Sequence, residues 1–226
     1  QMKEISMDFF RDEVRNGFFI PTAVKQAWAA QLQVLDVIET ICRKHDITYF
    51  ADWGTILGTV RHGGYVPWDD DMDICMKRED YTRFKEAAKT ELPKDFRIHD
   101  YEHQEDHWLF LSRVANSVHI NFEPEHMKQF HNFPYIAGID IFVLDYLYKD
   151  EQQEKQRCEE VKHIIAVADS IIAGEIAQPV KEANLIQLEQ KYHKTFNRKL
   201  DNHHMGIELY RLAEEKHRFL MEAFWI

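Results

Sequence analysis

Hydrophobic positions between residues 22 and 44 recur every three or four residues, which predicts an amphipathic helix that packs on a sheet. These positions are Val24, Trp28, Leu32, Leu35, Ile38 and Ile41. Residues 79–92 have a similar helical pattern. After Asp150 the pattern becomes helical throughout, which predicts helices over residues 151–177, 182–198 and 205–224, with Pro179 between the first two.

Short apolar or alternating runs in the first two-thirds of the chain predict strands, at residues 47–51, 71–76, 96–99, 108–114, 118–122 and 135–144. Glycines punctuate residues 54–64, which favours a turn, a short helix and a second turn. We therefore expect a mixed α/β fold of the α+β type, with a helical C-terminal third. One domain would span residues 1–226, with its core over about 22–148 and a helical extension over about 151–226.

Size and charge exclude several classes of protein. The chain has 226 residues and a net charge of −11, which argues against nucleic-acid partners and anionic membranes because both are bound through basic patches. We see no apolar run long enough for a transmembrane segment and no secretory signal. Cys42, Cys75 and Cys158 are far apart and form neither a disulfide framework nor a cysteine zinc site. We expect a cytoplasmic protein.

Four aspartates fall within five positions, just after Trp68; they are Asp69, Asp70, Asp71 and Asp73. Like charges this close repel one another. If residues 71–76 form a strand, Asp71 and Asp73 share one face. The other face then carries the apolar residues Met72, Ile74 and Met76. Two parallel carboxylates suit a hard divalent cation such as Mg²⁺, or Mn²⁺ in its place, and such an ion would offset the repulsion.

The same alternation places Asp69 on the face of Asp71 and Asp73, where it would support the site. Asp70 would lie on the other face, and we expect it to contribute least. A calcium-binding EF-hand loop is excluded, because its sixth and twelfth positions would be Ile74 and Asp80 rather than Gly and Glu. A solvated acidic loop and a metal site both remain open interpretations at this point.

Two further segments favour the metal site. Gly54 and Thr55 follow a predicted strand, where a glycine lets the backbone approach a phosphate and the next helix start supplies N–H donors. Asp140 lies between Ile139 and Ile141 inside an apolar strand. It is either a buried carboxylate with polar partners or a third acid beside the cluster, as metal ligand or general base.

These segments, in this order, resemble the nucleotidyltransferase fold, whose pattern is a hydrophobic-glycine turn, acid-x-acid on one strand and a third acid on a later strand. The stretch G-T-I-L-G-T-V-R-H-G-G-Y-V-P-W-D-D-D-M-D-I, residues 54–74, looks like the signature of the LicD family. That family includes bacterial phosphorylcholine transferases and is related to fukutin and fukutin-related protein. The resemblance covers roughly residues 30–145.

The resemblance implies a magnesium-dependent transferase that moves phosphocholine, or a related alditol phosphate, from a CDP-linked donor such as CDP-choline. The acceptor would be a glycan or lipid-linked sugar of the cell surface, such as lipopolysaccharide or teichoic acid. Carried over by position, the catalytic and metal residues are Asp71, Asp73 and Asp140, with Asp69 in support. The donor-binding residues are Gly54, Thr55, Arg61, Trp68 and Arg113.

Arg61 or Arg113 could neutralise charge on the leaving CMP, although Arg113 could equally be a surface residue at a strand end. Two alternatives to this activity remain. One is transfer of a nucleotidyl group from an NTP to a small molecule. The other is a non-catalytic nucleotide-binding relative, which the intact set Asp71, Asp73 and Asp140 argues against.

Overall fold

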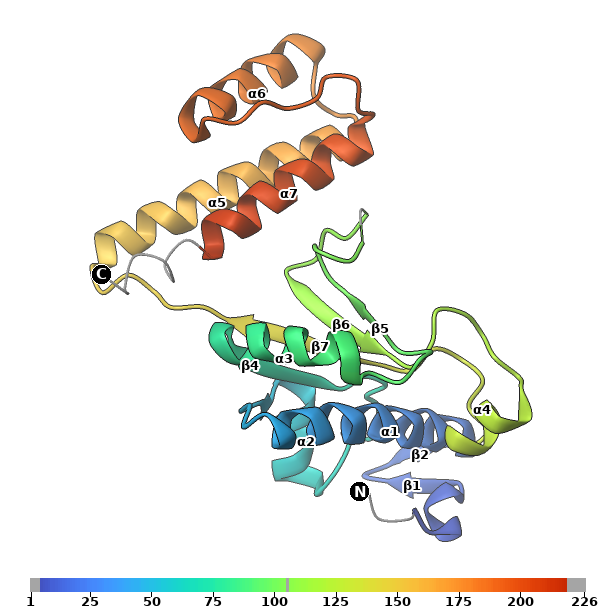
Figure 1. The fold of residues 1–226 in the computed structure, drawn as a ribbon. Coiled ribbons are helices and arrows are strands. Elements are labelled where there is room, and N and C mark those ends of the chain that lie inside the picture. The colour runs from blue at the N-terminus through green and yellow to red at the C-terminus, as the bar shows by residue number, and fades with distance from the viewer. Residues whose placement is uncertain (1–4, 105, 219–226) are drawn as a thin grey trace. The chain divides into compact units, whose positions relative to one another are not determined.

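The computed structural model describes residues 5–104 and 106–218 (Figure 1). These residues form two compact units. The sheet unit comprises the described residues of 1–100 and 111–144, and the helical unit comprises those of 101–110 and from 145 onward. The expectation of one domain with a helical extension stays a prediction.

The sheet unit contains a five-stranded mixed sheet with the strand order β3-β4-β7-β6-β5. The strands are β3 (Phe50–Ala51), β4 (Asp73–Lys77), β5 (Arg97–His99), β6 (Leu111–Ala115) and β7 (Gly138–Leu144). The central pair β4 and β7 is parallel, and the other neighbouring pairs are antiparallel. The predicted mixed α/β fold is confirmed.

Two helices cover one face of this sheet, α1 (Thr22–Lys44) and α3 (Arg78–Glu91). Of the apolar stripe predicted for residues 22–44, Trp28, Ile38 and Ile41 are buried, and Leu32 and Leu35 are partly buried against the core. The sheet contributes every second residue to the same core, including Met72, Ile74, Met76, Ile139 and Ile141. Alternation along a strand therefore leaves the intervening residues of β4 and β7 on the opposite face.

The remaining elements of the sheet unit are short. A 3-10 helix η1 (Met7–Phe10) precedes a hairpin of β1 (Glu13–Arg15) and β2 (Phe18–Ile20). Asn16 and Gly17 form its turn with φ of 52° and 79°, the conformation that Asn-Gly favours between antiparallel strands. Helix α2 (Trp53–His62) follows β3, and α4 (Pro124–Gln129) lies between β6 and β7 in the chain.

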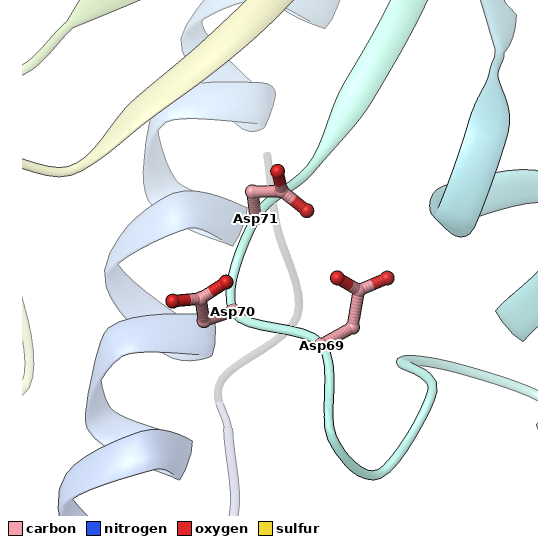
Figure 2. Close-up of side chains that lie close together, drawn as sticks. All are labelled: Asp69, Asp70 and Asp71. Carbon is pink, nitrogen blue, oxygen red and sulfur yellow. The ribbon is translucent and has the colours of Figure 1, made fainter.

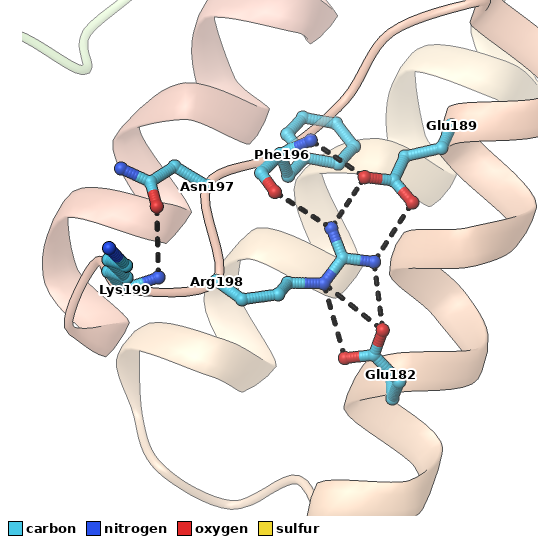
Figure 3. A network of polar contacts seen from close by, with 6 residues as sticks. All are labelled: Glu182, Glu189, Phe196, Asn197, Arg198 and Lys199. Carbon is cyan, nitrogen blue, oxygen red and sulfur yellow. Dashed lines mark hydrogen bonds and ion pairs between the residues drawn. The ribbon is translucent and has the colours of Figure 1, made fainter.

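The helical unit is built from α5 (Glu151–Ile172), α6 (Gln178–Tyr192) and α7 (Asn202–Arg218). Its own apolar core includes Ile164, Ile171, Leu185 and Leu209. The segment before α7 is fastened by Arg198, which forms ion pairs with Glu182 and Glu189 of α6 at 2.9 and 2.5 Å (Figure 3). No helix in the described part of the chain is long and apolar enough to cross a membrane.

Several predicted boundaries differ from the structure. Residues 118–122 are not a strand, and their apolar side chains Val118, Ile120 and Phe122 are exposed. The predicted strand 108–114 begins only at Leu111, because Trp108 packs against Tyr210 of α7, with ring centroids 5.5 Å apart. Pro179 lies in the first turn of α6 rather than before it, where a missing N–H costs no helical hydrogen bond. Residues 219–224 of the last predicted helix lie outside the described residues.

Candidate functional site

A row of charged residues crosses the middle of the sheet on the face opposite α1 and α3. Asp73 of β4 is the register partner of Asp140 on β7, and Asp140 is the partner of Arg113 on β6. Register partners on adjacent strands project from the same face, so these three side chains are neighbours. The sequence hypothesis placed Asp140 beside Asp71 and Asp73, and in the structure it lies beside Asp73.

Arg113 binds the Asp140 carboxylate with both ends of its guanidinium group. Nε donates to Oδ1 at 2.5 Å and one Nη donates to Oδ2 at 2.8 Å. These hydrogen bonds raise the pKa of Arg113. Gly138 makes room for the arrangement, because a Cβ at that position would lie 2.9 Å from Cδ of Arg113. The role of Arg113 at a leaving CMP stays a prediction, since its guanidinium group is about half exposed and is paired with Asp140.

Asp69, Asp70 and Asp71 form a second acidic group on the loop that leads into β4 (Figure 2). One oxygen of each carboxylate lies within 4.8 Å of the others, and among the described residues no other group of three or more potential metal ligands is this close. Asp71, Asp73 and Asp140 are therefore not one tight cluster. Asp71 and Asp73 remain electrostatically coupled, because the Asp71 charge acts on the Asp73 carboxyl.

The expectation that Asp70 matters least stays a prediction. One of its carboxylate oxygens lies within 4.8 Å of those of Asp69 and Asp71, but Asp69 and Asp71 line the adjoining cavity and Asp70 does not. Strand alternation does not apply here because β4 begins only at Asp73, two residues later than predicted. The loop before the strand follows its own path, and this path brings consecutive rather than alternate side chains together.

Crowding of negative charge affects proton binding in both acidic groups. Burial, together with the neighbouring Asp71 carboxyl, raises the pKa of Asp69 to about 6. Burial and then the charges of Asp71 and Asp140 raise the pKa of Asp73 to about 6. A bound cation would favour the ionised forms and remove this penalty.

The start of α2 holds the acidic residues in place. The backbone N–H of Asp73 donates to Oγ1 of Thr55 at 2.8 Å, and the backbone N–H of Asp52 donates to the carbonyl of Asp73 at 3.0 Å. A Cβ at Gly54 would lie 2.2 Å from Oδ2 of Asp69, so only glycine leaves room for that carboxylate. Gly54 and Thr55 thus lie beside the acidic groups, and their predicted contact with a phosphate stays a prediction.

Two other predicted residues lie farther along α2 and its following loop. Arg61 is exposed in the last turn of the helix, six residues after Thr55, and the helical rise places it about 9 Å further along the axis. Trp68 is 62% exposed and makes edge contacts with Phe18 and His62, with centroids 6.1 and 6.3 Å away. Neither residue is packed into the core, so both side chains remain accessible to a ligand.

A cavity of about 540 Å³ adjoins the acidic loop. Asp69, Asp71, Gly54 and Thr55 line it together with aromatic and aliphatic side chains from α1 and β3. The volume is in the range that binds small organic ligands. Sequence reasoning did not find Arg15 of the N-terminal hairpin, which also lines the cavity. The Asn16-Gly17 pair is the sequence feature that could have indicated this hairpin.

The potential metal ligands of the site are carboxylate oxygens, which suit a hard divalent cation. Octahedral Mg²⁺ holds its ligands at about 2.1 Å and so about 3–4 Å from one another. One carboxylate oxygen each of Asp69, Asp70 and Asp71 lies within 4.8 Å of the others, which is close to that spacing. The acidic row, the adjacent helix start and the mixed sheet together define a nucleotidyltransferase-type domain.

The family model described as "LicD/FKTN/FKRP, nucleotidyltransferase domain" matches residues 46–167, just over half of the chain. The chain belongs to this family, and the resemblance noted from residues 54–74 is confirmed. The match includes every predicted site residue.

Similar proteins align over a short segment. The lipopolysaccharide cholinephosphotransferase LicD of Haemophilus influenzae is 43% identical over 53 residues, which are 24% of this chain and 20% of that protein. An uncharacterised protein of Rickettsia typhi is 39% identical over 54 residues, 24% of this chain and 18% of that protein. The matched segment thus spans about a fifth of the length of these relatives.

Proposed function

We propose that this protein is a magnesium-dependent transferase that moves phosphocholine, or a related alditol phosphate, from a CDP-linked donor to a cell-surface glycan. The observation that carries the proposal is the pairing of Asp73 with Asp140 beside the acidic loop, in a chain of the LicD/FKTN/FKRP family. The short match to a lipopolysaccharide cholinephosphotransferase supports phosphocholine as the transferred group.

In this proposal Asp71 and Asp73 hold the divalent ion, Asp69 supports them, and Asp140 is the third carboxylate. The ion supplies charge neutralisation at the donor phosphates and lowers the pKa of a bound hydroxyl. Asp73 is suited to this role because it is 9% exposed, its backbone N–H donates to Thr55 of α2, and its carbonyl accepts from Asp52, the residue before α2. A ligand fixed in this way needs little reorganisation when the ion binds.

The cationic and hydroxyl groups of the site would orient the donor. Arg113 is held over the sheet by Asp140, where its guanidinium group can neutralise charge on a phosphate or on the departing CMP. Thr55 accepts a hydrogen bond from Asp73, which leaves its hydroxyl hydrogen to donate to a phosphate oxygen. In this proposal Asp140 either accepts the proton of the attacking hydroxyl or serves as a further metal ligand.

The test is release of CMP from CDP-choline, CDP-ribitol and CDP-glycerol, with Mg²⁺ and with EDTA. Donor binding to the full chain is measured in parallel by calorimetry. Asp71→Asn and Asp73→Asn are compared with the wild type and with Asp106→Asn, which alters an exposed carboxylate of the helical unit. We expect the first two variants to lose at least about 100-fold in turnover, as when a group that stabilises transition-state charge is removed. Asp106→Asn should match the wild type.

Two results would contradict the proposal at separate points. Undiminished CMP release by Asp73→Asn would remove the metal assignment. Absence of both binding and turnover with all three CDP donors would remove the donor assignment, and a panel of NTPs with product mass analysis would then test nucleotidyl transfer.

A further inference from the structure

Two side chains of α1 donate hydrogen bonds to the backbone of the acidic loop. The indole Nε1 of Trp28 donates to the carbonyl of Asp69 at 2.9 Å. The amide Nε2 of Gln31 donates to the carbonyl of Asp70 at 2.7 Å. Trp28 and Gln31 are one helical turn apart, so both side chains project from the same side of α1. Both precede the segment that the family model matches.

The two donors are themselves fixed. Trp28 is 1% exposed and Gln31 is 7% exposed. Tyr65 links them, because its ring stacks on Trp28 with centroids 4.7 Å apart and planes 8° apart, and its hydroxyl donates to Oε1 of Gln31 at 2.9 Å. Because the oxygen of the Gln31 amide accepts from this hydroxyl, its nitrogen must point to the loop.

The carbonyls of Asp69 and Asp70 are both hydrogen-bonded to side chains of α1. These two hydrogen bonds fix the backbone path of the loop at Asp69 and Asp70. Three adjacent carboxylates repel one another and would otherwise spread apart. Backbone anchoring opposes this spreading, since it sets the directions in which the Cα–Cβ bonds of the three aspartates leave the chain. The close approach of their oxygens, within 4.8 Å, depends on that backbone course.

We propose that Trp28 and Gln31 are positioning residues for the divalent-cation site, acting through the backbone carbonyls of Asp69 and Asp70. This inference rests on the proposed function, because it takes the acidic loop as part of the metal site. Neither side chain touches the ion. Their loss leaves all the carboxylates present but no longer held together, so cation affinity falls while the ligand set is unchanged.

The experiment measures Mg²⁺ and Mn²⁺ affinity of the full chain by calorimetry, with Mn²⁺ binding checked by electron paramagnetic resonance. Gln31→Met removes the amide at nearly constant volume. Trp28→Phe removes the indole N–H but keeps a ring to stack on Tyr65. Gln33→Met is the matched control, because its amide lies 3.1 Å from Nε2 of His131 and not at the acidic loop.

We expect cation affinity to fall about 10- to 100-fold in Gln31→Met and Trp28→Phe, the range found when groups that orient metal ligands are removed. Gln33→Met should bind as the wild type does. Thermal unfolding in EDTA separates this effect from general destabilisation. Gln31→Met loses the hydrogen bonds to the Asp70 carbonyl and from the Tyr65 hydroxyl, and Gln33→Met loses the one to His131, so the stability lost by each variant without metal is compared with its loss of cation affinity.

Unchanged affinity in both loop variants would overturn the inference and leave the proposed function standing. An equal loss of affinity in Gln33→Met would also overturn it. The lower affinity would then result from general destabilisation of the protein and not from the loss of hydrogen bonds to the acidic loop. If the wild type itself binds neither ion, the metal assignment of the proposed function fails instead.

Discussion

Asp73 is expected to weaken the fold of the metal-free protein, so Asp73→Asn should make that form more stable at neutral pH. The carboxyl is 9% exposed, and burial together with neighbouring carboxylates raises its pKa from 3.8 to about 6. A group whose pKa is higher in the folded state stabilises the fold below its unfolded pKa, and this contribution is lost as the pH rises through the folded pKa. The penalty is therefore complete above about pH 7.

The size of the effect follows from the shift. About two pKa units at 1.36 kcal/mol each give roughly 3 kcal/mol at pH 7.5. Screening by water at the loop side and imperfect hydrogen bonding of the new amide reduce this, so we expect a gain of about 1–3 kcal/mol in the free energy of unfolding. The gain should shrink toward zero as the pH falls from 7.5 to about 4, because the wild-type carboxyl then takes up its proton in both states.

Urea unfolding followed by tryptophan fluorescence, in EDTA, measures this difference at several pH values. Added Mg²⁺ should stabilise the wild type and have little effect on Asp73→Asn, because a ligand stabilises only the state that binds it. Asp106→Asn serves as the control for a change of net charge. An Asp73→Asn variant that is less stable than the wild type at pH 7.5, or a gain that does not vary with pH, would refute the electrostatic account.

Two glycine substitutions test the packing of the site. In Gly138→Ala the new Cβ would meet Cδ of Arg113 at 2.9 Å, so the guanidinium group should be displaced from Asp140 and turnover of the CDP donor should fall about 10-fold or more, with a stability loss of about 1–3 kcal/mol in urea unfolding. Wild-type turnover would show that the Arg113–Asp140 geometry is not needed. In Gly54→Ala the Cβ would lie 2.2 Å from Oδ2 of Asp69, so calorimetry should give Mg²⁺ affinity reduced about 10-fold, and unchanged affinity would exclude Asp69 from the ion's environment.

Local pattern was sufficient for the elements that bury one face. The spacing of Trp28, Ile38 and Ile41 predicted α1. The alternation of Met72, Ile74 and Met76 placed these side chains in the core. The short helix and the second turn predicted within residues 54–64 are present as α2 and the turn that begins at Gly63, but the helix already starts at Trp53 where the first turn was expected. These features depend on period alone, because a helix or strand must turn its apolar positions toward the same side.

Local sequence patterns did not predict the features that depend on contacts between distant segments. Residues 101–110 belong to the helical unit, where Trp108 and Phe110 pack on Tyr210, so the predicted strand 108–114 begins only at Leu111. Val118 and Phe122 look like strand residues but do not pair with the sheet in the structure. Gln31 carries no pattern of its own, and only its position opposite the acidic loop gives it a role.

The sequence by itself determined the family, the fold class and the residue types of the site, because the aspartates, Gly54 and Thr55 form a local signature. Tertiary structure alone decided which of these groups meet. Parallel pairing of β4 with β7 places Asp73 beside Asp140, and pairing with β6 adds Arg113. Side chains of α1 bind the loop on which Asp69, Asp70 and Asp71 lie close together. The physical reason is that pairing register and side-chain reach between elements depend on the packed core, which no short stretch of sequence contains.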